Sequence, residues 1–201
     1  MKKLILLFAL VLFLTVSGIS KNPYKAGDTA TDFNLRNVKG EMVSLSGYKD
    51  AKGFIVVFTC NTCPVAKKYE QRIMDLHEKF SDKGYPVIAI NSNDKNVSPG
   101  DSFEEMKKLS AVKDYRFVYL YDESQDVAKE YGATNTPHVY VLSKQGSNLK
   151  VEYVGAIDNN SDDGSKADKH YVENAVNSLL QGDRVSLAGT KAIGCTIKWK
   201  I

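Results

Sequence analysis

The feature that most constrains the fold is Phe54–Phe58, five apolar residues in a row that lead almost directly into Cys60-Asn61-Thr62-Cys63. An unbroken run of aromatic and β-branched residues is typical of a strand buried on both faces of a sheet. After the second cysteine, apolar residues recur at steps of three and four, which predicts a helix with one apolar face: Val65, Tyr69, Ile73, Leu76 and Phe80. The cysteine pair therefore stands where a central strand meets a helix.

The rest of the chain predicts alternating strands and helices. Further strand-like runs are Val87–Ile90, Phe117–Leu120, Val139–Leu142 and Leu149–Val154, and further helices are expected from Ser102 to about Val112, from Asp122 to Gly132 and from about Lys169 to Leu180. Near the start, Asp32–Arg36 and Glu41–Leu45 flank a turn and predict a hairpin. The polar stretch Asp158–Asp168 predicts a solvated loop, and the tail 182–201 shows no period. The order favours an α/β fold, a mixed central sheet with helices on both faces.

The first twenty residues form a separate signal. Lys2 and Lys3 precede an apolar run from Leu4 to Val16, and small residues follow up to Ser20. This pattern predicts a secretory signal peptide over residues 1–20. The alternative is an uncleaved anchor, but a bilayer needs about 20 apolar residues, more than this run supplies. We therefore expect one domain over 21–201, periplasmic or secreted, with no stable membrane insertion after cleavage.

Charge and cysteine content narrow the function. Without Lys2 and Lys3 the chain keeps 25 basic against 24 acidic residues, a balance that argues against a nucleic-acid binder. Three cysteines, Cys60, Cys63 and Cys195, are too few for a disulfide-stapled scaffold, and an odd number leaves one thiol to explain. The cysteines are therefore expected to carry chemistry.

The position of the cysteine pair favours a reactive thiol. Unpaired N–H groups and the partial positive charge of a helix's first turn stabilise a thiolate, so we expect the pKa of Cys60 to fall from about 8.5 toward neutrality. Cys60 is predicted to be the exposed nucleophile, and the more buried Cys63 to resolve the mixed disulfide. The alternatives are an inert disulfide and a zinc half-site, which needs four ligands.

A second motif, Thr136-Pro137-His138-Val139, precedes a strand, and together with the strand–cysteine pair–helix unit it resembles the thioredoxin superfamily. Near the amino terminus, the patterns Gly27-x-x-Ala30-x-Asp32-Phe33-x-Leu35 and Val43-x-Leu45 resemble the redoxin branch of this superfamily. That branch includes the AhpC/TSA proteins and ResA- and TlpA-like periplasmic reductants. With Gly194–Trp199 added, the chain is similar to a peroxiredoxin-like group of thioredoxin-family proteins. The resemblance spans about residues 25–200 and implies a thioredoxin-like fold with an N-terminal β-hairpin extension.

The resemblance also implies roles for individual residues. Pro137 is expected to be cis and to face the cysteines, and Thr136 to offer its backbone to a bound substrate. His138 either tunes the thiolate or contacts substrate, or is a strand residue with a satisfied ring. The chain departs from the pattern of its relatives in two ways. The strand before Cys60 lacks the buried acid that thioredoxins carry there, and the chain lacks the Pro and Thr that peroxiredoxins place before their reactive cysteine.

These observations favour an exported thiol–disulfide oxidoreductase without organic cofactor or metal. Its substrates would be protein or small-molecule disulfides, and a thiol protein would donate electrons. The alternatives are a peroxiredoxin-like thiol peroxidase and a copper-binding assembly chaperone, whose cysteines stand three residues apart rather than two. Cys195 is expected to be a small buried packing residue, because Cys60 and Cys63 pair with each other. A third exchanging thiol is the other interpretation, and it requires Cα atoms within about 7 Å.

Overall fold

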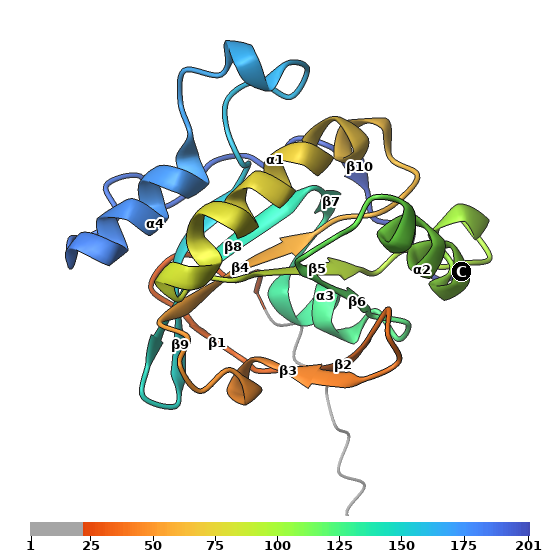
Figure 1. Ribbon diagram of the computed structural model, residues 1–201, viewed down its shortest axis with the longest axis horizontal. Helices are drawn as coiled ribbons and strands as arrows, with labels where there is room; N and C mark the ends of the chain where they lie inside the picture. Colours follow the sequence, from red (N-terminus) through yellow and green to blue (C-terminus); the bar gives the residue numbers. More distant parts are fainter. Residues whose placement is uncertain (1–21) are drawn as a thin grey trace, which may run out of the picture.

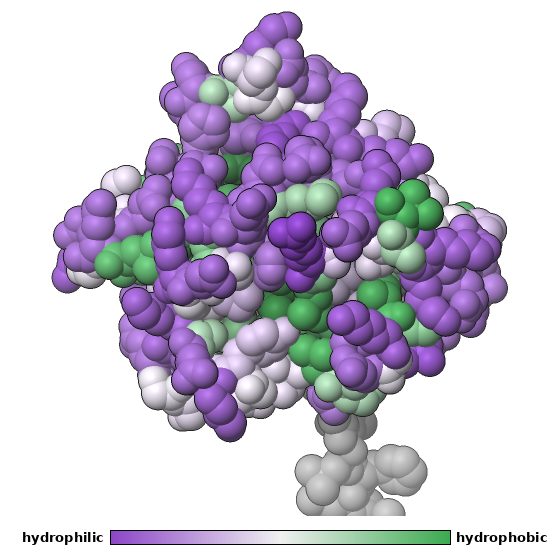
Figure 2. All heavy atoms as spheres, viewed as in Figure 1, coloured by the Kyte–Doolittle hydropathy of each residue, from purple (hydrophilic) through white to green (hydrophobic). Residues whose placement is uncertain are grey.

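The computed structural model describes residues 22–201, so the predicted signal peptide lies outside the described residues. Within 22–201, no helix has both the length and the apolar character needed to cross a bilayer. The face of the molecule in Figure 2 is largely hydrophilic, with hydrophobic side chains in small scattered groups. Many apolar side chains of residues 22–201 are buried, where they form the core described below.

One mixed sheet of eight strands organises the described residues (Figure 1). In spatial order its strands are β1 (Thr29–Ala30), β9 (Asn148–Gly155), β8 (His138–Gln145), β4 (Gly53–Phe58), β5 (Val87–Asn91), β6 (Val118–Tyr121), β2 (Asn34–Asn37) and β3 (Met42–Ser44). A separate two-stranded sheet joins β7 (Asn135–Thr136) to β10 (Cys195–Thr196). The helices are α1 (Pro64–Phe80), α2 (Phe103–Val112), α3 (Asp126–Tyr131) and α4 (Tyr171–Gln181). Short 3₁₀ helices cover Leu45–Gly47, Ser81–Lys83, Pro99–Asp101 and Gly164–Lys166.

The sheet confirms the predicted α/β class. Strands β4, β5 and β6 run parallel, β8 pairs antiparallel with β4, and β9 pairs antiparallel with β8. The expected N-terminal hairpin is formed by β2 and β3, and β2 attaches it to the edge of the sheet by pairing with β6. Every residue of β4 is buried, as the continuous apolar run predicts.

The two faces of β4 explain why the strand has to be apolar throughout. Ile55 and Val57 pack in the core that includes the apolar sides of α1 and α4. Phe54, Val56 and Phe58 point the other way, into the core that includes α3 and the N-terminal segment. Figure 1 shows the same arrangement, with α1 and α4 on one side of the sheet and α3 on the other. Helices on both sides thus leave β4 no solvated face.

Helix α1 begins later than the cysteine pair suggests. Its first residue is Pro64, and Cys63 is the N-cap, whose Sγ accepts a hydrogen bond from the backbone N–H of Ala66 at 3.4 Å. Proline is favoured at the first helical position because it has no N–H to lose there. Cys60 consequently lies in the loop before the helix, and the Ala66 N–H of the first helical turn points to Cys63.

The stretch Asp158–Asp168 is not uniformly solvated, contrary to the sequence prediction. Asp158 is buried and accepts hydrogen bonds from Arg72 at 2.6 Å and from the Tyr69 hydroxyl at 3.1 Å. The Arg72 guanidinium also lies 3.6 Å from the centre of the Tyr69 ring. These contacts tie the start of the loop to α1, because a buried carboxylate needs a partner of opposite charge.

Replacing Arg72 by Met should lower the free energy of unfolding by about 3 kcal/mol, because it leaves the buried carboxylate of Asp158 without its cation. Lys68→Met is the matched control on the same helix. Lys68 pairs with Asp162, and both side chains are largely exposed, so its loss should change the free energy of unfolding much less, because solvent screens an exposed pair. Urea unfolding of both variants measures the difference, and equal losses would contradict the importance of the buried pair.

Candidate active site

The three cysteines of the chain meet at one place, where the end of β4, the start of α1 and the tail come together. Cys60 and Cys63 are buried, with 6% and 4% of their surface exposed, and they pack with Ala66. Cys195 lies against the same cluster and is only partly buried. In Figure 1, β10 lies beside β7, near the N-terminal end of α1.

The Thr136–Pro137 peptide bond is cis, as the resemblance implies. Thr136 lies between the sulfurs: its Oγ1 is 3.2 Å from Cys60 Sγ, within hydrogen-bonding distance, and its carbonyl oxygen is 3.4 Å from Cys63 Sγ. The expected neighbourhood of Thr136, Pro137 and the cysteine pair is therefore present.

The pairing of the cysteines differs from the sequence prediction. The disulfide joins Cys63 to Cys195, whose Cα atoms are 6.0 Å apart, and Cys60 is a free thiol. The expectation that Cys60 and Cys63 pair with each other, with Cys195 only a packing residue, is wrong for this state. The physical reason is the antiparallel pairing of β10 with β7, which places Cys195 directly opposite Thr136 and so beside Cys63.

The same pairing changes the role expected for Thr136. Its register partner is Cys195 of the chain's own tail, so this edge of β7 is already paired with a strand. Thr136 therefore contributes its hydroxyl and carbonyl groups to the sulfur cluster, while its pairing position is taken.

Asp101 is a site residue that sequence reasoning missed. It is fully buried and accepts hydrogen bonds from the backbone N–H groups of Asn61 and Thr62 at 2.6 and 3.2 Å and from the Thr62 hydroxyl at 2.6 Å. Ser98 and Asn93 donate to it as well, at 2.6 and 2.8 Å. One carboxylate thus holds the two residues between the cysteines. No spacing in the polar loop around Pro99 distinguishes Asp101 from its neighbours.

The environment of Cys60 raises the pKa of its thiol, where the sequence predicted a lowered value. Burial is the main cause, and the negative charge of Asp101 adds to it. Hydrogen bonds from the Thr136 hydroxyl and from the backbone of Cys63 and Thr62 act in the opposite direction. The expectation of an exposed, thiolate-stabilised Cys60 is wrong for this state, because the residue lies before the helix, under cover and near a carboxylate.

His138 is a buried residue of β8. Burial lowers the pKa of its imidazole to about 4, so the ring is neutral at pH 7. The backbone N–H of Thr134 donates to Nδ1 at 3.4 Å, and the ring lies 4.9 Å from that of Tyr140. A neutral, packed imidazole supplies no positive charge to a thiolate, which favours the strand-residue interpretation.

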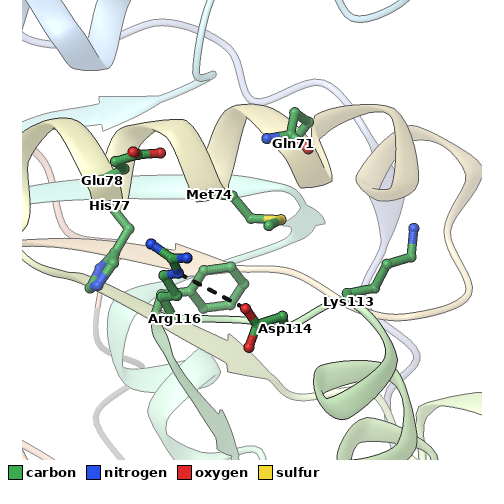
Figure 3. Close-up of a pocket in the computed structure, with 8 residues that line it drawn as sticks. Gln71, Met74, His77, Glu78, Lys113, Asp114 and Arg116 are labelled. Atoms are coloured by element: carbon green, nitrogen blue, oxygen red, sulfur yellow. Dashed lines mark ion pairs between the residues drawn. The ribbon is translucent and has the colours of Figure 1, made fainter.

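Several hollows lie along α1 within the described residues, and none of the larger ones is lined by a cysteine. A pocket of about 350 Å³ is lined by side chains that Figure 3 draws, among them Gln71, Met74, His77 and Arg116, and no cysteine lines it. The hollow that Cys60 does line has a volume of about 10 Å³, roughly the space of one water molecule. The sulfur cluster is therefore packed, without a preformed chamber for a ligand.

Within residues 22–201, no group of three or more His, Cys, Asp or Glu side chains is arranged to hold a metal ion. Two of the three sulfurs are bonded to each other. A zinc site would need four ligands, so the described residues do not form the set that the zinc interpretation requires.

The family model described as the AhpC/TSA family matches residues 26–153, which include both Cys60 and Cys63 and the cis-proline motif. The chain belongs to this family. Among curated relatives, the thiol-disulfide oxidoreductase ResA of Bacillus cereus is 23% identical over 157 residues, 73% of this chain and 86% of the relative. Peroxiredoxin Q of Oryza sativa subsp. japonica is 32% identical over 135 residues, 64% of this chain and 57% of the relative.

Solved structures agree with this placement. An uncharacterized conserved protein from Geobacillus kaustophilus is similar with a TM-score of 0.81 and 37% identity, over 89% of this chain and 94% of that one. A putative thiol:disulfide interchange protein DsbE from Chlorobium tepidum has a TM-score of 0.57 and 21% identity, over 79% of this chain and 99% of that one. At this identity the second likeness shows the thioredoxin-like fold alone, and the first extends over almost the whole chain.

Asp101→Asn should lower the pKa of the Cys60 thiol, because it removes a negative charge that raises this pKa while keeping an oxygen that accepts the loop amides. Alkylation of Cys60 by iodoacetamide at pH 7 should become severalfold faster, because a lower pKa raises the fraction of the reactive thiolate. The measurement is the alkylation rate against pH, in the form that carries the Cys63–Cys195 disulfide.

Asp122→Asn is the matched control for this experiment. Asp122 is another buried carboxylate, but it is not among the groups that shift the pKa of Cys60. An alkylation pKa that moves equally in both variants, or in neither, would contradict the electrostatic role of Asp101.

Proposed function

We propose that this protein is a thiol–disulfide oxidoreductase in which Cys60 is the nucleophile and Cys63 the second thiol of the pair. The observation that supports this most is the meeting of a free thiol and a disulfide in one packed cluster at Thr136. The names of the AhpC/TSA relatives, thiol-disulfide oxidoreductase and peroxiredoxin, support oxidoreductase activity. Protein or small-molecule disulfides are the proposed substrates, and a dithiol protein is the proposed electron donor.

The reaction starts from the reduced chain. The Cys60 thiolate attacks one sulfur of the substrate disulfide, a mixed disulfide forms and the first substrate thiolate leaves. The Cys63 thiolate then attacks Cys60 Sγ and displaces the second substrate thiolate. Two electrons have passed to the substrate, and the chain carries a Cys60–Cys63 disulfide. A donor dithiol returns the two electrons and restores the thiols.

The site keeps Cys60 protonated until a substrate engages it. Burial and Asp101 disfavour the thiolate, whereas the Thr136 hydroxyl and the loop amides are in place to stabilise it. Because only a small hollow reaches the sulfur, the substrate disulfide must displace part of the cover as it binds. Thr136 and Pro137 form the wall that it meets next to the sulfurs.

Peroxide reduction is the second candidate function. The 32% identity to peroxiredoxin Q favours it, and the unmatched Pro and Thr before the reactive cysteine oppose it. Assays with hydrogen peroxide and with copper, run beside the disulfide assay, separate these functions. Thiol-dependent peroxide turnover faster than disulfide turnover would make the peroxidase the better assignment.

Cys63→Ser should accumulate mixed disulfides between Cys60 and the substrate, because the thiol that resolves them is missing. Cys60→Ser, the matched control with the same chemical change three residues earlier, should accumulate none. Turnover of a protein disulfide should fall to the uncatalysed rate in both variants. Non-reducing electrophoresis and mass spectrometry identify the trapped species. Trapping by Cys60→Ser instead would reverse the two assignments.

We also propose that the chain is exported, with residues 1–20 removed as a signal peptide. The support is the basic start, the apolar run and the small residues that follow it. After expression in a bacterial host, the protein recovered from the periplasm or the medium should begin near Lys21, as amino-terminal sequencing will show. An intact Met1 in the membrane fraction would contradict the proposal.

A further inference from the structure

The tail is held in place on the amino-terminal side of Cys195 and directly after it. The Asn135 side chain donates to the Gly194 carbonyl at 2.9 Å, and the backbone N–H of Ile197 donates to the Thr134 carbonyl at 2.9 Å. Ile197 itself is buried, 3% exposed, in the core that includes Phe58. Release of the tail would expose this apolar side chain to water, so burial of Ile197 opposes release.

Further along, the tail is tied to two loops. The Lys198 carbonyl accepts from the backbone N–H of Asp94 and from Gln125 Nε2, both at 2.8 Å, and the Lys198 N–H donates to Asn93 Oδ1 at 2.8 Å. The Lys200 N–H donates to Gln125 Oε1 at 2.9 Å. Cys195 therefore belongs to a segment fixed on both sides, which holds its Cα 6.0 Å from that of Cys63.

Gly194 lets the tail come this close. A Cβ at this position would collide with the carbonyl group of Thr136. Only glycine permits that approach of two backbones, and the approach sets Cys195 opposite Thr136. The residue before Cys195 is thus part of the reason that its sulfur lies beside Cys63.

The three cysteines also differ in exposure. Cys60 and Cys63 are buried, whereas Cys195 is partly exposed at the edge formed by β10. An incoming thiolate must approach the residue that it attacks, so Cys195, the more exposed of the two bonded cysteines, is the better placed for attack.

We infer that Cys195 is a third redox cysteine of the enzyme: it takes over the disulfide from Cys60 and Cys63, and it is the sulfur at which the donor thiol attacks. This inference rests on the proposed function and assigns separate entry points to its two half-reactions. Substrate disulfides react at Cys60, and reducing equivalents enter at Cys195.

The steps balance as thiol–disulfide exchanges. After substrate reduction, the Cys195 thiolate attacks Cys63 Sγ of the Cys60–Cys63 bond, the Cys63–Cys195 bond forms, and Cys60 leaves as a thiolate that takes up a proton. A donor thiolate then attacks Cys195 Sγ, a mixed disulfide with Cys195 forms, and Cys63 leaves as a thiolate. The second donor thiol attacks the donor sulfur of that mixed disulfide, so the donor is oxidised and the chain carries three thiols again.

Disulfide mapping tests whether Cys195 takes over the disulfide from Cys60 and Cys63. The fully reduced chain is oxidised by a stoichiometric disulfide substrate, the remaining thiol is alkylated in acid-quenched samples, and peptides are identified by mass spectrometry. We expect the alkyl group on Cys60 and a Cys63–Cys195 link. A Cys60–Cys63 link with alkylated Cys195 would overturn the inference.

Gly194→Ala tests the positioning of the tail, with Gly47→Ala as the matched control. A Cβ at Gly47 meets nothing closer than 3.7 Å. Circular dichroism first checks that the Gly194→Ala variant is folded. The ratio of the Cys60–Cys63 disulfide to the Cys63–Cys195 disulfide should then rise about tenfold, the change that a 1.4 kcal/mol penalty on the docked tail produces. The control should keep the wild-type map. Unchanged maps in both variants would contradict the role of Gly194.

Glutathione tests the entry point. Cys60→Ser, oxidised to the Cys63–Cys195 form, is mixed with reduced glutathione and quenched in acid within seconds. The adduct should lie on Cys195 at about tenfold excess over Cys63, the factor that 1.4 kcal/mol of barrier produces. An adduct mainly on Cys63 would overturn the assignment of Cys195 as the attacked sulfur.

The glutathione experiment measures which sulfur of the Cys63–Cys195 disulfide is attacked, and it needs no substrate. If it and a map obtained with an inorganic oxidant come out as expected but no substrate disulfide is reduced, the proposed function fails and the Cys195 exchange stands. If substrates are reduced but the map shows Cys60–Cys63, the exchange fails and the proposed function stands.

Discussion

The antiparallel pairing of β10 with β7 determines which sulfurs of this protein can meet. It aligns Cys195 with Thr136, and Thr136 in turn contacts both Cys60 and Cys63. Without this short pairing, the chain would present a cysteine pair at a strand–helix junction and an open edge beside the cis-proline. With it, that edge is occupied by the chain itself, and a third sulfur lies within bonding distance of the second. The tail is therefore part of the site.

The site balances two opposing electrostatic effects. Backbone amides and the Thr136 hydroxyl favour a Cys60 thiolate, while burial and the Asp101 carboxylate favour the thiol. Burial and Asp101 have the larger effect, so the pKa of the Cys60 thiol is raised. Asp101 also accepts hydrogen bonds from the loop between the cysteines. The same carboxylate thus fixes the geometry of the loop and limits the reactivity of its first thiol. A resting thiol under cover suits an enzyme that reacts only when a disulfide displaces that cover.

The relatives of this AhpC/TSA family chain are named for two chemistries, thiol–disulfide exchange and peroxide reduction. Both begin with a nucleophilic thiol and end with a disulfide that must be reduced again. In the described structure of this chain the disulfide joins Cys63 to Cys195, a partly exposed residue of the tail, and Cys60 is a free thiol. The first thiol is thereby free while the chain is still oxidised.

Local patterns in the sequence determined the mixed sheet, the fully buried β4 and the helix after Cys63. Each of these depends on residues close together in the chain, where hydrophobic periodicity and cap chemistry act directly. The cis peptide bond before Pro137 followed from the resemblance to the thioredoxin superfamily. The sequence alone did not determine the burial of Cys60, the contacts of Asp101, the ion pair of Asp158 or the partner of Cys63. Cys63 and Cys195 are separated by 132 residues, and no local rule relates them. Only the packing of the tail against β7 decided that they meet, because a disulfide forms where the backbone places two Cα atoms within about 7 Å, wherever in the chain they lie.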